Sequence, residues 1–350
     1  MAGTRWLRVL RGPATLDDMP LPARLPGRLA ATAVLLVVTI AGAGCTGGPS
    51  PSPTPTTPPG VTVKQAQSVA NQVVTGWRAA HRTSWDPAAW DAVDALPARI
   101  ADDAAVQAGA ARRDAGTYQP STFPNTFTVR KVYAHSTTDG TEYLLVAGYY
   151  VTPAKKAIAD SDAVQLYVRE GAGSWRYASG VGSEGVSGTT AAKRGLAVSF
   201  TPLAEQPGVD VSTTGTNADL LAALQEAARP KAGTTSVTAD GTKLTAGAEA
   251  WGGDYYSVKA ADCTVPSGPA IASFDVQEGA LSLVQLDCDV ELSTGSKTLI
   301  VWTDPVTGKQ VLGSGAKLRV LYEALVRTEG GSYTVLAHYD RWAGLPTVTK

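Results

Sequence analysis

The stretch SLVQLDCDVEL, residues Ser282–Leu292, alternates strictly between apolar and polar side chains. Successive side chains of a β-strand point to opposite faces of the sheet, so this pattern predicts a long strand with one buried face. The apolar positions are Val284, Leu286, Cys288, Val290 and Leu292, and the polar positions are Gln285, Asp287, Asp289 and Glu291. The second half of the chain therefore contains a sheet, and Cys288 lies on its buried face.

Helical segments precede strands in both halves of the chain. In the second half, Asn217 or Thr216 opens ADLLAALQEAARP, and Pro230 ends it because proline lacks the N–H that a helix needs. In the first half, a helical stretch starts near Val63, Ser84 is a candidate cap of a second helix, and Ala98–Ala115 predicts a third. The predicted strands of this half are TFTVRKVYA, EYLLVAGYYV, AVQLYVR and GSWRYAS. Among these, EYLLVAGYYV is almost entirely apolar, which predicts a strand covered on both faces.

A short repeat relates the two halves. VREGAGSW (Val168–Trp175) matches VRTEGGSY (Val326–Tyr333) at an offset of 158 residues, and each closes a segment of helix followed by strands. This favours tandem copies. We therefore predict an α+β fold of two related lobes, each with an N-terminal helical segment packed on an antiparallel β-sheet. This layout resembles NTF2-like and cystatin-like sheets, and the chain as a whole resembles surface lipoproteins of high-GC Gram-positive bacteria.

The N-terminal sequence predicts an export signal. Arg24 and Arg28 precede an uncharged apolar run, Leu29–Ile40, which fades through small residues to Cys45. A basic flank, a short apolar core and a small-residue exit are typical of a secretory signal. The alternative is a retained transmembrane helix, but that needs about 20 apolar residues, more than this run offers. A signal that begins at Met19 has a short basic segment before its apolar core, whereas one that begins at Met1 also contains two aspartates. We therefore predict that translation begins at Met19.

The residues around Cys45 resemble the lipobox of bacterial lipoproteins, in which the cysteine is acylated and becomes the mature N-terminus. Ala43 and Gly44 fit the lipobox, whereas Gly42 stands where that family favours leucine. A Pro/Ser/Thr-rich stretch follows and predicts an extended tether. The predicted segments are 1–44 (signal), 45–60 (lipid-anchored linker), 61–188 (first lobe) and 189–350 (second lobe).

The chain has only two other cysteines, Cys263 and Cys288. With Cys45 assigned to the lipid, and in an oxidising compartment, we predict that these two form a disulfide bond. The chain has no C-x-x-C motif and no zinc-binding cysteine spacing, so we predict neither a redox centre nor a metal site.

One set of polar residues is a candidate for chemistry. If Glu329-Gly330 is a two-residue turn, Arg319 lies opposite Asp340, and His338 lies opposite Leu321 and diagonal to Glu323. Neighbours on one face of a sheet are about 5 Å apart, so the four polar side chains would meet, with His338 poised for acid–base work. The alternative is a set of ion pairs on a solvated face. The residues 158 positions earlier in the chain are Ser161, Gln165, Gly180 and Gly182. The first lobe therefore lacks the four polar residues of this candidate site.

Other motifs lack the context that their chemistry needs. GVGSEG (residues 180–185) has no helix after it for dinucleotide binding, and SGAK (residues 314–317) lacks the partner motifs of penicillin-interacting enzymes. Trp77, Trp85 and Trp90 are close in sequence and either line a sugar- or lipid-accepting groove or pack two helices on a sheet. The net charge of −1 gives no reason to expect nucleic-acid binding.

These observations favour a lipid-anchored, extracytoplasmic protein at the cell membrane that binds an envelope protein or polymer, without a cofactor and without catalysis. The first alternative is a small-molecule-binding protein or acid–base enzyme with an NTF2-like pocket in the second lobe. A purely structural envelope protein is a further alternative.

Overall fold

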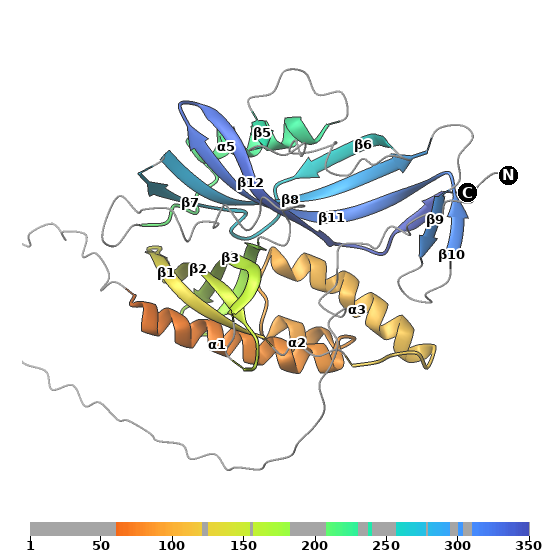
Figure 1. The fold of residues 1–350 in the computed structure, drawn as a ribbon, viewed down its shortest axis with the longest axis horizontal. Helices are drawn as coiled ribbons and strands as arrows, with labels where there is room; N and C mark the ends of the chain where they lie inside the picture. The colour runs from red at the N-terminus through yellow and green to blue at the C-terminus, as the bar shows by residue number, and fades with distance from the viewer. Residues whose placement is uncertain are drawn as a thin grey trace, which may run out of the picture.

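The computed structural model describes residues 61–120, 125–154, 157–182, 208–229, 237–239, 257–277, 279–294, 300–303 and 310–349. The predicted signal segment, Cys45 and the tether lie outside these residues. The predicted α+β class is confirmed: two β-sheets pack face to face, with helices on their outer faces (Figure 1). In order, the layers are helix α1, the first sheet, the second sheet and helix α5.

The first sheet follows a helical segment. The helices are α1 (Val63–Ala80), the 3₁₀ turn η2 (His81–Thr83), α2 (Pro87–Asp91) and α3 (Ala98–Asp114). The strands are β1 (Thr126–Ser136), β2 (Thr141–Val151), β3 (Ala157–Glu170) and β4 (Arg176–Gly182), paired antiparallel in that order. Helix α1 starts with a capping box between Thr62 and Gln65. Helix α2 is capped by Asp86 rather than by the predicted Ser84, because Asp86 directly precedes Pro87 and accepts the N–H of Ala88.

The second sheet follows α5 (Thr216–Ala228). Its strands are β5 (Val237–Ala239), β6 (Ser257–Thr264), β7 (Ile271–Val276), β8 (Gly279–Ser293), β11 (Gly315–Glu329), β12 (Ser332–Trp342) and β13 (Thr347–Thr349). Strands β9 (Ile300–Thr303) and β10 (Gln310–Gly313) form a separate two-stranded sheet. Strands β6 and β7 both pair with β8 along one edge, and β8, β11 and β12 are paired antiparallel in that order. Strand β8 confirms the strand predicted from its alternating sequence.

Strand alternation divides the apolar residues among three cores. In β2, Leu144 and Val146 face α1, whereas Leu145 and Ala147 face the second sheet, which confirms that this strand is covered on both faces. In β8, the predicted apolar positions from Val284 to Leu292 pack with α5. The core between the sheets, here called the inter-sheet core, includes Leu145, Leu166, Leu281, Leu283 and Leu325. The two sheets thus stabilise each other by burying their inner faces together.

Both terminal hairpins contain a β-bulge at matching positions. In β4, Ala178 is the extra residue between the pairs Leu166–Ser179 and Tyr167–Tyr177. In β12, Leu336 is the extra residue between Leu325–Ala337 and Val326–Val335. Ala178 and Leu336 are 158 residues apart, and both side chains lie in the inter-sheet core. The offset predicted from the sequence therefore holds for β4 and β12, but becomes 159 for β3 and β11, where Leu166 matches Leu325.

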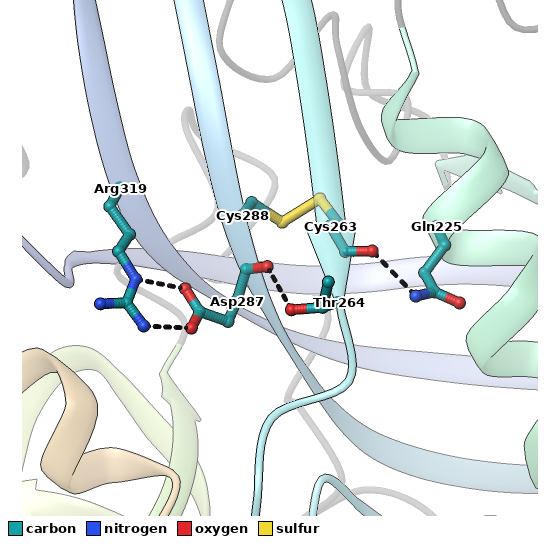
Figure 2. Close-up of a disulfide and its surroundings, with 6 residues drawn as sticks. All are labelled: Gln225, Cys263, Thr264, Asp287, Cys288 and Arg319. Atoms are coloured by element: carbon teal, nitrogen blue, oxygen red, sulfur yellow. Dashed lines mark hydrogen bonds and ion pairs between the residues drawn. A yellow bond between two sulfur atoms is a disulfide. The ribbon is translucent and has the colours of Figure 1, made fainter.

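The predicted disulfide is confirmed: Cys263 of β6 and Cys288 of β8 are directly opposite each other and bonded (Figure 2). The bond lies under α5, whose Gln225 donates a hydrogen bond to the carbonyl of Cys263 at 2.8 Å. It therefore joins an edge strand to the long central strand on the side that α5 covers. In the described part of the chain, no helix is both long and apolar enough to span a membrane.

The double variant C263A/C288A tests the contribution of this bond. Its cysteines are 25 residues apart, and releasing a loop of that size costs about 3 kcal/mol, which corresponds to a fall in melting temperature of roughly 5–10 °C. Differential scanning calorimetry measures the fall, and reductant should lower the wild type to the same temperature. An unchanged melting temperature in both experiments would contradict a stabilising role.

Candidate functional site

The β11–β12 hairpin has a different register from the one predicted. Its turn is Gly330-Gly331, with φ of 56° and 81°, and Glu329 pairs with Ser332. The predicted turn at Glu329-Gly330 is wrong because the chain turns with positive φ at both central positions, a conformation that two glycines adopt without strain and Glu329 would not. The turn shifts the register by two residues, and the bulge at Leu336 shifts it by one more.

This shift of three residues separates the four candidate side chains. An odd shift moves residues to the opposite face of a strand. Arg319 and Glu323 share the inner face of β11, whereas His338 pairs with Ala324 and Asp340 with Tyr322 on the α5 side. The predicted meeting of all four residues is therefore wrong, and they occupy three separate environments.

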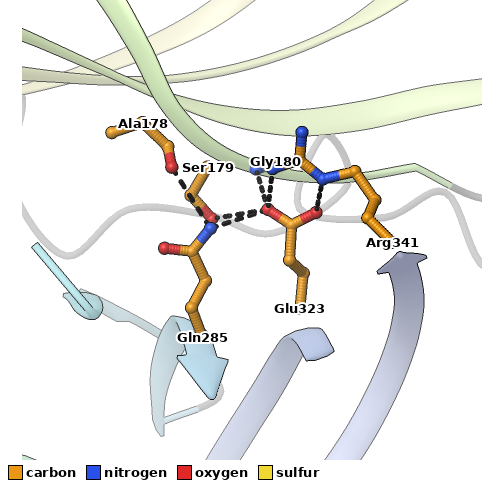
Figure 3. A network of polar contacts seen from close by, with 6 residues as sticks. All are labelled: Ala178, Ser179, Gly180, Gln285, Glu323 and Arg341. Atoms are coloured by element: carbon orange, nitrogen blue, oxygen red, sulfur yellow. Dashed lines mark hydrogen bonds and ion pairs between the residues drawn. The ribbon is translucent and has the colours of Figure 1, made fainter. Parts of the chain in front are cut away.

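Glu323 lies between the two sheets and is fully buried (Figure 3). Arg341 of β12 donates to its two carboxylate oxygens, from Nε at 2.8 Å and from its terminal nitrogen at 3.3 Å. Gln285 of β8 donates to Oε1 at 2.7 Å, and β4 adds the N–H of Gly180 at 3.2 Å and the hydroxyl of Ser179 at 3.4 Å. One carboxylate thus connects β4 of the first sheet with three strands of the second.

Arg341 remains charged in this environment. Burial opposes its positive charge, but Glu323, Tyr177 and the carboxyl groups of Asp102 and Asp94 favour it, and together they raise its pKa. Its guanidinium also lies over the ring of Tyr177, 5.7 Å from the centroid. Both carboxylate oxygens of Glu323 accept hydrogen bonds from the protein itself. Glu323 therefore has a structural role and is poorly placed to act as a base.

Two further buried carboxyl groups adjoin Arg341. Asp94, just after α2, and Asp102, on α3, are 3% and 5% exposed, and their side chains hydrogen-bond each other. Trp77 of α1 donates its indole N–H to Asp94 at 2.7 Å. The sequence analysis missed this pair. The signal available was the position of Asp102, one helical turn after Ala98 on the buried face of α3.

Arg319 forms an exposed ion pair instead of a site. Its guanidinium donates to both carboxylate oxygens of Asp287 on β8, at 3.0 and 2.6 Å (Figure 2). Half of the Arg319 side chain is exposed, and the bond to Asp287 raises its pKa. Arg319 is thus in an ion pair, as the alternative interpretation expected, but its partner is Asp287 rather than Asp340.

His338 and Asp340 lie together on the α5 side of β12. Nδ1 of His338 is 3.6 Å from Oδ2 of Asp340, and the imidazole stacks on Tyr322 with ring centroids 5.8 Å apart. In the described part of the chain, both imidazole nitrogens and Oδ1 of Asp340 are buried without a hydrogen-bond partner. Of the four candidates, only His338 and Asp340 have buried side-chain atoms without a hydrogen-bond partner among the described residues.

The tryptophans stabilise the helical segment. Trp90 is buried against Ala80 and Val93, and Trp85 stacks edge-to-face on Tyr118. Together with the bond from Trp77 to Asp94, these contacts favour the packing interpretation over a groove. Among the described residues, no three His, Cys, Asp or Glu side chains are grouped to hold a metal ion.

Glu323→Gln tests the buried anion. The substitution leaves Arg341 charged and buried without its counter-ion, so we expect a loss of about 3 kcal/mol in the free energy of unfolding, measured by urea titration. The matched control is Arg319→Gln, which breaks an exposed ion pair and should cost less than about 1 kcal/mol. Equal losses in the two variants would contradict a special role for Glu323.

Comparison with known proteins does not connect this chain to a family. No family model, no curated protein and no solved structure matches it. The function is therefore argued from its own residues.

Proposed function

We propose that the chain is a lipid-anchored, extracytoplasmic protein whose folded part binds a protein or polymer of the cell envelope without catalysing a reaction. The disulfide between Cys263 and Cys288 is the observation that carries this proposal. Disulfides persist in oxidising compartments, which is consistent with export. The bond also accounts for two of the three cysteines, leaving Cys45 at the end of the apolar run as the residue available for acylation.

The tether has the length and composition of a spacer. Residues 46–60 are rich in proline and small polar residues, and α1 begins at Val63, directly after them. Fifteen residues in an extended polyproline-like conformation span about 45 Å. On this proposal, the lipid on Cys45 fixes the chain to the membrane, and the spacer holds the folded part away from the bilayer.

The positions of the candidate residues favour binding over catalysis. Glu323 is saturated by hydrogen bonds within the inter-sheet core, and Arg319 is paired with Asp287 at the surface. Neither lies with His338 and Asp340. Acid–base catalysis needs its groups within hydrogen-bonding reach of one reacting atom, and these four do not converge.

The arrangement of the two sheets supports descent from a duplicated unit of the NTF2-like or cystatin-like type. Each sheet has a helix on its outer face and a bulge at the matching position of its last hairpin, Ala178 or Leu336. Leu166 and Leu325 both face the inter-sheet core, whereas Tyr167 and Val326 both face their own helical layer. A change of one residue in the hairpin turn accounts for the difference in offset.

A second candidate function is binding of a small polar molecule at His338. The unused buried nitrogens of His338 and the unused oxygen of Asp340 favour it, because buried polar atoms normally have partners. A ligand with both a donor and an acceptor would satisfy them. The described residues establish neither a reaction nor a substrate for this pair.

Substitution of Cys45 tests the anchor. Cys45→Ala should abolish incorporation of a fatty-acid analogue and leave an unprocessed precursor, because the acylated sulfur is missing. Gly42→Leu, which restores the residue that the lipobox favours, should increase the processed fraction. Labelling followed by mass analysis of the mature N-terminus measures both effects, and label retained in the Cys45→Ala chain would contradict the proposal.

Crosslinking in intact cells, followed by mass spectrometry, tests the binding role. We expect a specific, saturable envelope partner, captured equally by the wild type and by His338→Asn, because binding a macromolecule does not need the buried imidazole. If instead a small molecule copurifies with the wild type and is lost from His338→Asn, the second candidate function replaces the first.

A further inference from the structure

The segment between α2 and α3 attaches the helical layer to the edge of the first sheet. The N–H of Tyr177 on β4 donates to the carbonyl of Val93 at 2.8 Å, and the N–H of Ala95 donates to the carbonyl of Tyr177 at 2.7 Å. Asp94, between these two residues, forms an isolated parallel bridge with Tyr177. The carboxyl group of Asp94 thus lies where α1, α3, β4 and β12 meet. We call this junction, residues 93–95 with Tyr177, the edge junction.

The two carboxyl groups at this point need a proton. Asp94 and Asp102 hydrogen-bond each other, and two carboxyl groups can do so only if one of them is protonated. Asp94 also accepts the indole N–H of Trp77, and Oδ2 of Asp102 is buried without a partner in the described part of the chain. The pair therefore carries one negative charge while its proton is bound.

Two cations near the pair, Arg341 and Arg99, lower the pKa of both carboxyl groups, but each is already engaged by other carboxylates. On β12, Arg341 is engaged by Glu323 of β11. On α3, Arg99 is engaged by Asp91 and Asp103. The other titratable groups that act on the pair are tyrosines, namely Tyr177 of β4 and Tyr167 of β3, whose pKa values burial raises well above the usual value. Loss of the shared proton would leave two adjacent buried anions among neutral or already paired groups.

The environment favours retention of the proton. Burial raises the pKa of Asp94 in spite of its hydrogen bonds from Asp102 and Trp77. Burial, and then the negative charge of Asp94, raise the pKa of Asp102 well above its usual range. These directions agree with the hydrogen-bonded geometry and follow from the same cause, the removal of both groups from water.

We propose that Asp94 and Asp102 form a proton-dependent latch, which fastens the edge junction when the shared proton is bound and releases it when the proton is lost. Two like charges in contact at low dielectric repel strongly. Movement of residues 93–95 away from β4 lets water reach Asp94 and relieves that repulsion. The latch responds to the pH around the protein wherever the chain is located. This proposal therefore does not depend on the proposed lipid anchor or on the proposed binding partner, and its test is independent of theirs.

The sign of the effect follows from linkage. In the open junction, both carboxyl groups have ordinary pKa values near 4. In the closed junction the pKa of the pair is elevated, so the closed form binds the extra proton. Its stabilisation is therefore complete below about pH 4 and is lost as the pH rises through the elevated pKa. Between these limits, the opening constant increases by up to about tenfold per pH unit for one proton.

Hydrogen exchange of the full chain, measured by mass spectrometry from pH 5 to pH 9 and corrected for intrinsic exchange, tests the latch. In the wild type, the amides of Ala95 and Tyr177 should lose protection as pH rises, by about tenfold or more across the range, while the amides of α5 do not. Asp102→Asn supplies a neutral partner for Asp94. It should remove most of this pH response, so that its junction is better protected than the wild-type junction at pH 9.

The control is Asp114→Asn, which changes an exposed aspartate on the same helix, with 70% of its side chain exposed, and should respond as the wild type does. If Asp102→Asn does not fold, Asp94→Asn gives the same comparison, because it also leaves one ionisable carboxyl group. The proposal is overturned if the junction and α5 respond to pH alike in the wild type. It is also overturned if Asp114→Asn removes the response as fully as Asp102→Asn.

Discussion

The packing of the two sheets depends on one buried carboxylate. Glu323 is fully buried between the sheets, so it must receive a positive charge and several hydrogen bonds to be tolerated there. Arg341 supplies the charge, Gln285 supplies a donor from the neighbouring strand, and β4 supplies donors from the other sheet. Apolar contacts alone would permit several relative positions of two flat surfaces. The geometry of these hydrogen bonds favours one.

The same arrangement explains why the helices lie on the outside. Each sheet has apolar residues on both faces, and once the inner faces are buried together, each outer face needs a separate cover. Helix α1 covers the first sheet and α5 covers the second. The disulfide lies in the outer core under α5, whereas the carboxylates lie in and beside the inner layer, so the two kinds of constraint act on different parts of the molecule.

Local patterns in the sequence predicted the elements, but not the tertiary contacts. The alternation around Cys288 was sufficient to predict β8 and its buried face, because strand periodicity is a property of adjacent residues. The prediction of the hairpin register failed because the register depends on which two residues form the turn and on a bulge at Leu336. An error of an odd number of residues reverses the face of every side chain.

The pair Asp94–Asp102 was missed because its environment is formed by Trp77, Tyr177 and Arg341, of which Tyr177 and Arg341 are far from it in sequence. The shared offset of 158 was correct for one strand of the hairpin and one residue short for the other.

The bulge at Leu336 decides more than local geometry. Beyond it, strand β12 turns Arg341 toward the inter-sheet core and His338 and Asp340 toward the α5 side. Leu336 and Ala337 both face the inter-sheet core, so the bulge places two consecutive side chains on one face of β12. If Leu336 took a regular place in the ladder instead, every later side chain of β12 would change face, and Glu323 would meet a histidine and an aspartate instead of its arginine. The identity of the charge that meets Glu323 therefore depends on the backbone conformation at Leu336 and not on the composition of the strand.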